Sequence, residues 1–198
     1  MKLFLIVFCP VLSTLSSTVR CEDAPPPAIA VTIEARGETL AAVDSPRIIM
    51  AAWLDGRLIW SHDQTKGGAP FLTAQIDPAK ILAVLDRFEK EDVFKKDKVR
   101  RSWFGPDSSF HSVWLKSGVR HVQVRTWHEL FEANPNLVAV NGGITALNGR
   151  KREDVIQSDT KEFQTFRKLW TDIRTSTSAL IPKAGKPFAD PLKLNLPR

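Results

Sequence analysis

Residues 110–127 read FHSVWLKSGVRHVQVRTW, and this stretch decides the fold because it contains two strands and the turn between them. Apolar and polar side chains alternate on both sides of Ser117 and Gly118, which is the pattern of antiparallel strands joined by a tight turn. A two-residue turn at these positions pairs Lys116 with Val119. That register places the following residues on one face, which we expect to pack on the core: His111, Val113, Leu115, Arg120, Val122 and Val124.

The opposite face of this hairpin gathers polar groups around an aromatic ring. It holds Phe110, Ser112, Trp114, His121, Gln123 and Arg125. We predict a binding site there, formed by Trp114, His121, Gln123 and Arg125, because a large aromatic ring beside amide, imidazole and guanidinium groups suits a polar ligand or a protein partner. The alternative is that the C-terminal helix covers this face, in which case Trp114 belongs to the core.

Outward from this hairpin, a second one is indicated by Asp55 and Gly56, which separate apolar runs at residues 48–54 and 57–62. The Asp-Gly pair favours a two-residue turn and predicts that Leu54 pairs with Arg57. Both faces of the hairpin are then apolar, so we expect it near the middle of the sheet. Further strands are expected at residues 28–36, 71–76, 137–140 and 144–147.

Two helices complete the predicted fold. Asp77 is a good N-cap with Pro78 at the first helical position, and an apolar stripe follows at helical spacing. A second helix is expected after Asp159, which forms the spacing of a capping box with Glu162. We therefore predict an α+β fold, an antiparallel sheet built from β-hairpins with two main helices packed against it.

The N-terminus predicts export. Lys2, an apolar run at residues 3–12 and a Ser/Thr-rich segment are typical of a signal peptide, expected over residues 1–21. The run is too short to span a membrane, so we expect no stable membrane span after signal removal. Cleavage after Cys21 removes both cysteines, which excludes a disulfide scaffold. Lipid attachment at Cys21 is the alternative, although Arg20 before it disfavours that processing.

The rest of the chain divides simply. We predict a Pro-rich spacer at residues 22–27, a single α+β domain at residues 28–181, and an extended Pro-rich tail at residues 182–198. The formal net charge of the full chain is +6. Removal of residues 1–21, which contain Lys2, Arg20 and no acid, lowers it by two charges to +4. That mildly basic balance fits a secreted or periplasmic protein that meets an anionic polymer, a cell-envelope component or a protein, rather than nucleic acid.

Motifs for catalysis are weak. The sequence from His128 to Glu132, HELFE, is close to the zinc-protease signature, but Glu132 stands where the second histidine belongs and no third ligand is evident. His111 and His121 point to opposite hairpin faces, so they form no metal pair. No Gly-x-Ser-x-Gly elbow is present, and no motif predicts a metal or cofactor. Residues 95–101 with Trp103 form a basic and aromatic patch, for which a solvated loop is the simpler interpretation.

The segments DGRLIWS, the helix after Asp77, FGPDSS and WHELFEANPNLV resemble small secreted proteins of planctomycete-type bacteria. The resemblance covers most of the chain after residue 21. It implies an exported or envelope location and transfers no activity, cofactor or catalytic residue.

The leading functional hypothesis is a secreted or periplasmic, non-enzymatic binding domain. It follows from the missing catalytic motifs and from the predicted face with Trp114, His121 and Arg125. The alternative is a small hydrolase or metal-assisted enzyme that uses His121 or His128 with nearby carboxylates.

Overall fold

The computed structural model describes residues 25–35, 47–95, 101–103, 109–141, 143–189 and 194. Its strands are β1 (Ile29–Ala35), β2 (Arg47–Ala52), β3 (Arg57–Ser61), β4 (Phe71–Gln75), β5 (Ser102–Trp103), β6 (Ser109–Ser117), β7 (Arg120–Thr126), β8 (Leu137–Val140), β9 (Gly143–Ala146) and β10 (Lys186–Phe188). Its helices are α1 (Pro78–Lys90), α2 (His128–Glu132), α3 (Arg152–Gln157) and α4 (Lys161–Ser178).

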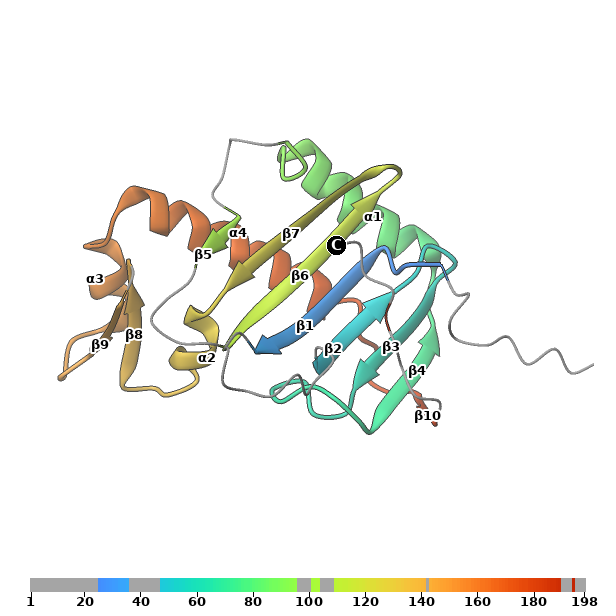
Figure 1. The fold of residues 1–198 in the computed structure, drawn as a ribbon, viewed down its shortest axis with the longest axis horizontal. Helices are drawn as coiled ribbons and strands as arrows, with labels where there is room; N and C mark the ends of the chain where they lie inside the picture. The colour runs from blue at the N-terminus through green and yellow to red at the C-terminus, as the bar shows by residue number, and fades with distance from the viewer. Residues whose placement is uncertain are drawn as a thin grey trace, which may run out of the picture.

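Eight strands form one sheet in the order β10-β4-β3-β2-β1-β6-β7-β5, and the short β5 is parallel to β7 while the other pairs are antiparallel. The helices α1 and α4 lie on one side of this sheet (Figure 1). The predicted α+β fold is therefore confirmed. The strands expected at residues 137–140 and 144–147 are present as the hairpin of β8 and β9, but this hairpin forms a separate two-stranded sheet beside α3 instead of joining the large one (Figure 1).

The main core lies between the sheet and the two long helices. The inner hairpin face predicted from the sequence contributes Val113, Leu115, Val122 and Val124, all buried in one cluster with Phe88 of α1 and Phe166 of α4. The cap of α1 is as predicted, because Asp77 Oδ1 accepts a hydrogen bond from Ala79 N (2.9 Å) and Pro78 begins the helix. The alternation of apolar residues on β6 and β7 thus determines which side of the sheet the helices cover.

The turn of the central hairpin differs from the prediction. Ser117 pairs with Arg120 and Lys116 with His121, so the turn residues are Gly118 and Val119, and the predicted pairing of Lys116 with Val119 is wrong. Gly118 has φ +59°, a conformation that glycine adopts at the first turn position without the steric cost that a serine would have there. The new register moves each partner by two residues, so the predicted membership of both faces is unchanged.

The hairpin at Asp55 and Gly56 departs further from its predicted register. Trp53 N donates to Arg57 O (2.9 Å), so the loop has three residues and the predicted pairing of Leu54 with Arg57 is wrong. Gly56 is the left-handed residue, with φ +90°, as in three-residue hairpin loops. The one-residue change exchanges the face partners: Met50, Ala52, Leu58 and Trp60 join the main core, while Ala51, Trp53 and Ile59 form a second cluster. Both faces of the hairpin are nevertheless covered, as predicted.

The N-cap of the second long helix lies one residue after the predicted one. Thr160, not Asp159, is the N-cap of α4, and its Oγ1 accepts from Phe163 N (3.3 Å). The carboxylate of Asp159 instead accepts hydrogen bonds from the backbone N–H groups of Asn141 (2.9 Å) and Thr160 (2.7 Å). Asp159 therefore joins α4 to the end of β8.

Part of the predicted C-terminal tail belongs to the sheet. Lys186–Phe188 forms β10 on the edge of β4, and Phe188 and Leu194 pack against the second cluster around Trp53. The predicted signal peptide, the start of the spacer and residues 96–100 of the predicted basic loop lie outside the described residues. Within the described ranges, no helix has the length and apolar character needed to cross a membrane.

Candidate functional site

The four residues of the predicted binding site share one face of the β6–β7 hairpin. Trp114 lies directly opposite Gln123, and Arg125 opposite Ser112, while His121 is exposed and lies nearer the turn, opposite Lys116. Gln123 Nε2 donates to Ser112 Oγ (2.7 Å), and the guanidinium of Arg125 lies 5.9 Å from the ring centre of Phe110. The predicted alternative, coverage by the C-terminal helix, is wrong, because α4 packs on the opposite side of the sheet.

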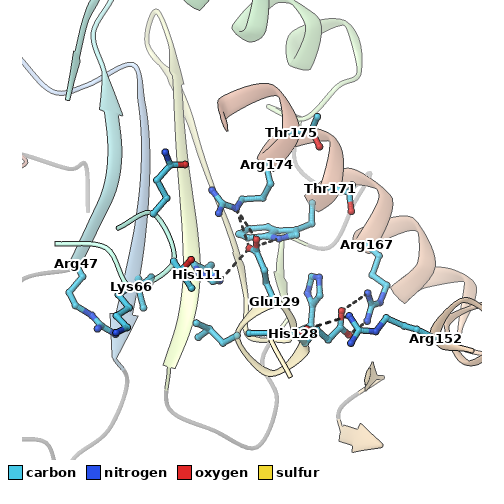
Figure 2. Close-up of a pocket in the computed structure, with 17 residues that line it drawn as sticks. Arg47, Lys66, His111, His128, Glu129, Arg152, Arg167, Thr171, Arg174 and Thr175 are labelled. Atoms are coloured by element: carbon cyan, nitrogen blue, oxygen red, sulfur yellow. Dashed lines mark hydrogen bonds and ion pairs between the residues drawn. The ribbon is translucent and has the colours of Figure 1, made fainter. Parts of the chain in front are cut away.

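A large cavity lies elsewhere, and none of these four residues lines it. It has a volume of about 840 Å³ and is bordered by the ends of β1, β2 and β6, the loop between β3 and β4, α2 and α4. Figure 2 shows its side chains converging from the strands on one side and from α4 on the other. The described lining is rich in charge: it includes Arg47, Lys66, Arg152, Arg167 and Arg174, the carboxylates Glu129 and Glu132, and the imidazoles of His111 and His128.

One carboxylate of the cavity is committed to a structural ion pair. Glu132 accepts hydrogen bonds from both terminal nitrogens of Arg167, and the two side chains are only 10% and 12% exposed. Glu132 Oε1 also accepts from Ala139 N (2.7 Å), and Arg167 donates to Ala139 O (3.0 Å). This network joins α2, β8 and α4 at the end of the cavity, and its charges cancel.

Arg152 stabilises the same end, and no carboxylate in the described part of the chain pairs with it. Its terminal nitrogens donate to the backbone carbonyl oxygens of Glu132 (3.3 Å), Asn134 (3.1 Å), Pro135 (3.3 Å) and Leu137 (2.9 Å). These bonds hold the segment between α2 and β8 in place. They engage both terminal nitrogens of Arg152 with neutral acceptors, so among the described residues its positive charge has no ion-pair partner.

The second carboxylate, Glu129, lies at the centre of the cavity (Figure 2). Its Oε2 accepts hydrogen bonds from Trp170 Nε1 (3.1 Å) and Arg174 Nε (3.1 Å), and it lies 3.3 Å from His111 Nδ1. The latter is an electrostatic contact and not an aligned hydrogen bond, because His111 Nδ1 has no hydrogen-bond partner. Arg174 uses only Nε for Glu129; its two terminal nitrogens form no hydrogen bond with any residue that the structure describes.

The two histidines of the cavity are buried and neutral at neutral pH. Burial lowers the pKa of His111 to about 4; the carboxylate of Glu129 opposes this shift, while Arg174 and Arg47 reinforce it. Burial, followed by Arg167 and His111, lowers the pKa of His128 to about 3. His128 Nδ1 is 2.6 Å from the buried Thr126 Oγ1. Both rings therefore act here as uncharged polar groups.

The structure does not bring His121 and His128 together with the carboxylates that the predicted enzyme would use. The carboxylate nearest in sequence to His128, Glu129, turns to His111 instead, and His121 lies on the exposed outer face of the hairpin. No group of three His, Cys, Asp or Glu side chains suited to a metal ion exists within the described part of the chain. Comparison with known protein families and with curated protein sequences finds no match for this chain.

Several residues of the cavity were not predicted as site residues. His111 was assigned to the core face, which is correct, but His111 pairs with Thr126 at the end of β7, next to the start of α2. The sequence indicates this proximity, because only Trp127 separates the end of β7 from HELFE. Arg47, Lys66 and Arg174 come from distant segments that only the tertiary fold brings together, so no local pattern could identify them.

Proposed function

We propose that the protein is a secreted or periplasmic, non-enzymatic binding protein whose ligand is an anion held in the cavity. The charge balance of the lining carries this proposal. Both carboxylates are bonded to arginines, Glu132 to Arg167 and Glu129 to Arg174, whereas Arg47 and Lys66 form no ion pair among the described residues. Together with Arg152, they leave an excess of positive charge that attracts and retains anions.

The size of the cavity supports an organic anion. About 840 Å³ lies within the range of pockets that enclose small organic ligands. Apolar atoms from Ile33, Leu130 and Trp170 also line it, and Thr171 and Thr175 add hydroxyl groups. A small organic anion, or one segment of an anionic polymer, is compatible with this mixture of apolar, hydroxyl and cationic groups.

The second candidate is a hydrolase, and the proximity of His111 to Glu129 is the observation that favours it. A carboxylate beside Nδ1 could orient the imidazole so that Nε2 acts as a general base in the cavity. Binding is favoured over this function because Arg174 and Trp170 already use Glu129, and because a pKa of about 4 makes His111 a weak base. Hydrolysis of phosphate or carboxylate esters that is lost in His111→Gln would support the enzyme.

A thermal-shift panel tests the binding function. Citrate, glucose 6-phosphate and dextran sulfate oligosaccharides are expected to raise the melting temperature, whereas glucose and choline are not. The double variant Arg47→Gln, Lys66→Gln should lose the effect. The exposed Lys80 and Lys90 of α1 provide a control with the same charge change, Lys80→Gln, Lys90→Gln, which should keep it. Equal responses to glucose and the anions, or equal responses of both double variants, would reject the proposal.

The exported location is tested separately. N-terminal sequencing of the protein from the native host's extracellular or periplasmic fraction should give a chain that starts at Glu22. Recovery of an uncleaved chain from the cytoplasm would contradict the secreted location and leave the binding site untouched.

A further inference from the structure

In the half of the cavity next to the large sheet, three lining residues are aligned across neighbouring strands. Arg47 of β2 pairs with Ile33 of β1, and Ile33 pairs with His111 of β6. The three residues therefore form a row across adjacent strands, which are spaced about 4.8 Å apart, and their side chains point to the same side of the sheet. That side is the one on which α4 lies.

The loop after β3 adds a second cation to the end of this row. Gly68 N donates to Ile48 O (2.8 Å), so the loop that carries Lys66 packs against the start of β2. Figure 2 shows Lys66 beside Arg47 at this end of the cavity. Both side chains are exposed, and neither forms an ion pair with a residue that the structure describes; the carboxylate of Asp63 interacts with Lys66 only electrostatically. Both cations are therefore available to a ligand.

Arg174 completes the group from the opposite side. Its side chain extends from α4 toward the strands (Figure 2), and Glu129 occupies only its Nε. The two terminal nitrogens thus keep a fork of N–H donors that faces the strand side, where Arg47, Lys66 and His111 lie. Such a fork binds two oxygens of one oxyanion at once.

The positive charge and the N–H donors of Arg47, Lys66 and Arg174 favour one class of ligand. Arg47, Lys66 and Arg174 carry three positive charges and Glu129 carries one negative charge, so these four lining residues have a net charge of +2. A carboxylate ligand supplies one negative charge and two oxygens, whereas a phosphate monoester near neutral pH carries −1.5 to −2 charges and three acceptor oxygens. Cationic side chains from α4, β2 and the loop after β3 therefore favour the ligand with the larger negative charge.

We propose that Arg47, Lys66, His111 and Arg174, the strand-side subsite, bind the tetrahedral oxyanion group of a phosphorylated ligand. This inference rests on the proposed binding function and names the group that the cavity recognises. The organic part of the ligand then extends toward α2, past Leu130 and Trp170. Arg174 supplies the fork, Arg47 and Lys66 supply charge at the mouth, and the neutral imidazole of His111 supplies an uncharged polar contact.

Isothermal titration calorimetry of the full chain at pH 7 and fixed ionic strength tests this subsite, with sulfate, phosphate, methanesulfonate and acetate as probes. Sulfate and phosphate should bind at least tenfold more tightly than acetate. Methanesulfonate, which has three oxygens but a single charge, should lie between them. Arg174→Gln should remove the preference for sulfate over acetate, and Arg174→Lys should restore part of it.

Because Arg174 also holds Glu129, a second variant keeps the test independent of folding. Arg47→Gln, Lys66→Gln changes two exposed side chains and should weaken sulfate binding at least tenfold, while Lys80→Gln, Lys90→Gln should not. Acetate binding as tightly as sulfate would overturn the subsite and leave the binding function standing. If neither these anions nor citrate binds in a manner that depends on Arg47 and Lys66, both proposals fail.

Discussion

The Nε atom of Arg174 lies 3.1 Å from Oε2 of Glu129. This contact determines what the carboxylate of Glu129 and the guanidinium of Arg174 can each bind in the cavity. Glu129 is neutralised and fixed at the centre, with Trp170 Nε1 as a second donor (3.1 Å). Arg174 keeps its terminal nitrogens for another partner. An arginine that is positioned by a carboxylate and still presents a fork is prepared for an oxyanion before the ligand arrives.

Replacing Glu129 tests this relationship. In Glu129→Gln the amide oxygen can still accept from Trp170, but the negative charge is lost, so the field of the cavity becomes more positive. We expect sulfate to bind roughly tenfold more tightly, at a cost of about 1 kcal/mol in the free energy of unfolding. Calorimetry and urea denaturation measure the two effects. The exposed Glu153 of α3 gives the control Glu153→Gln. Weaker sulfate binding by Glu129→Gln would contradict this expectation and would mean that the positioning of Arg174 by the Glu129 carboxylate matters more than the repulsion between that carboxylate and sulfate.

The ion pair between Glu132 and Arg167 should be structural. Both side chains are nearly buried, so Glu132→Gln leaves the Arg167 charge without its partner and should lower the free energy of unfolding by about 3 kcal/mol or more. The pair between Arg87 and Glu91 is largely exposed, and Glu91→Gln should cost far less. Urea denaturation of the two variants makes the comparison. Equal costs would mean that the Glu132 network is solvated in solution.

Stability should fall in mild acid because of the two buried histidines. The pKa of His111 is lowered to about 4 and that of His128 to about 3, against about 6.5 in the unfolded chain. Between these values the unfolded state binds more protons than the folded state, so the free energy of unfolding decreases as the pH falls below 6.5. At pH 5 each histidine should cost roughly 2 kcal/mol.

Chemical denaturation at several pH values measures this slope. His128→Gln removes one titrating group and should flatten the slope, although the variant starts from a lower stability. The exposed His62 gives the matched control variant, His62→Gln. A wild-type stability that is constant from pH 7 to pH 5 would contradict the buried, neutral state of both rings.

The three-residue loop before β3 predicts a difference between two glycines. A Cβ at Gly56, where φ is +90°, would lie 2.2 Å from Ile76 O, whereas a Cβ at Gly118, where φ is +59°, meets nothing within 4 Å. Gly118→Ala should therefore cost only the left-handed backbone penalty of about 1–2 kcal/mol. Gly56→Ala should cost clearly more, because the backbone of Ile76 must also move. Thermal unfolding of both variants tests this order, and an equal loss would argue against the observed loop.

The sequence predicts elements and faces better than it predicts contacts. Alternation along β6 and β7 identified the core face even though the turn was placed one position too early, because a two-residue shift in pairing keeps the same faces. The same type of error at Asp55 and Gly56 exchanged the faces, since a loop of three residues instead of two changes the parity. Turn chemistry alone did not distinguish the two loop lengths.

The candidate site could not be predicted in the same way. His111 and Glu129 lie 18 positions apart in the sequence, and Arg47 and Arg174 are separated by most of the chain. They meet because β2, β1 and β6 are neighbours and because α4 crosses their ends. Only His111 and the HELFE segment carried a local signal, the position of a histidine at a strand end beside the start of a helix.

The most direct test of the anion site is an NMR titration of the ¹⁵N-labelled protein with sulfate. The indole N–H of Trp170 bonds to Glu129 inside the cavity, whereas that of Trp53 bonds to Pro25 O (2.7 Å) on the other face of the sheet. Saturable movement of the Trp170 indole signal is expected, with Trp53 unchanged and with the movement lost in Arg47→Gln, Lys66→Gln. A Trp170 signal that stays fixed as sulfate is added, or that moves equally in the double variant, would contradict the anion site.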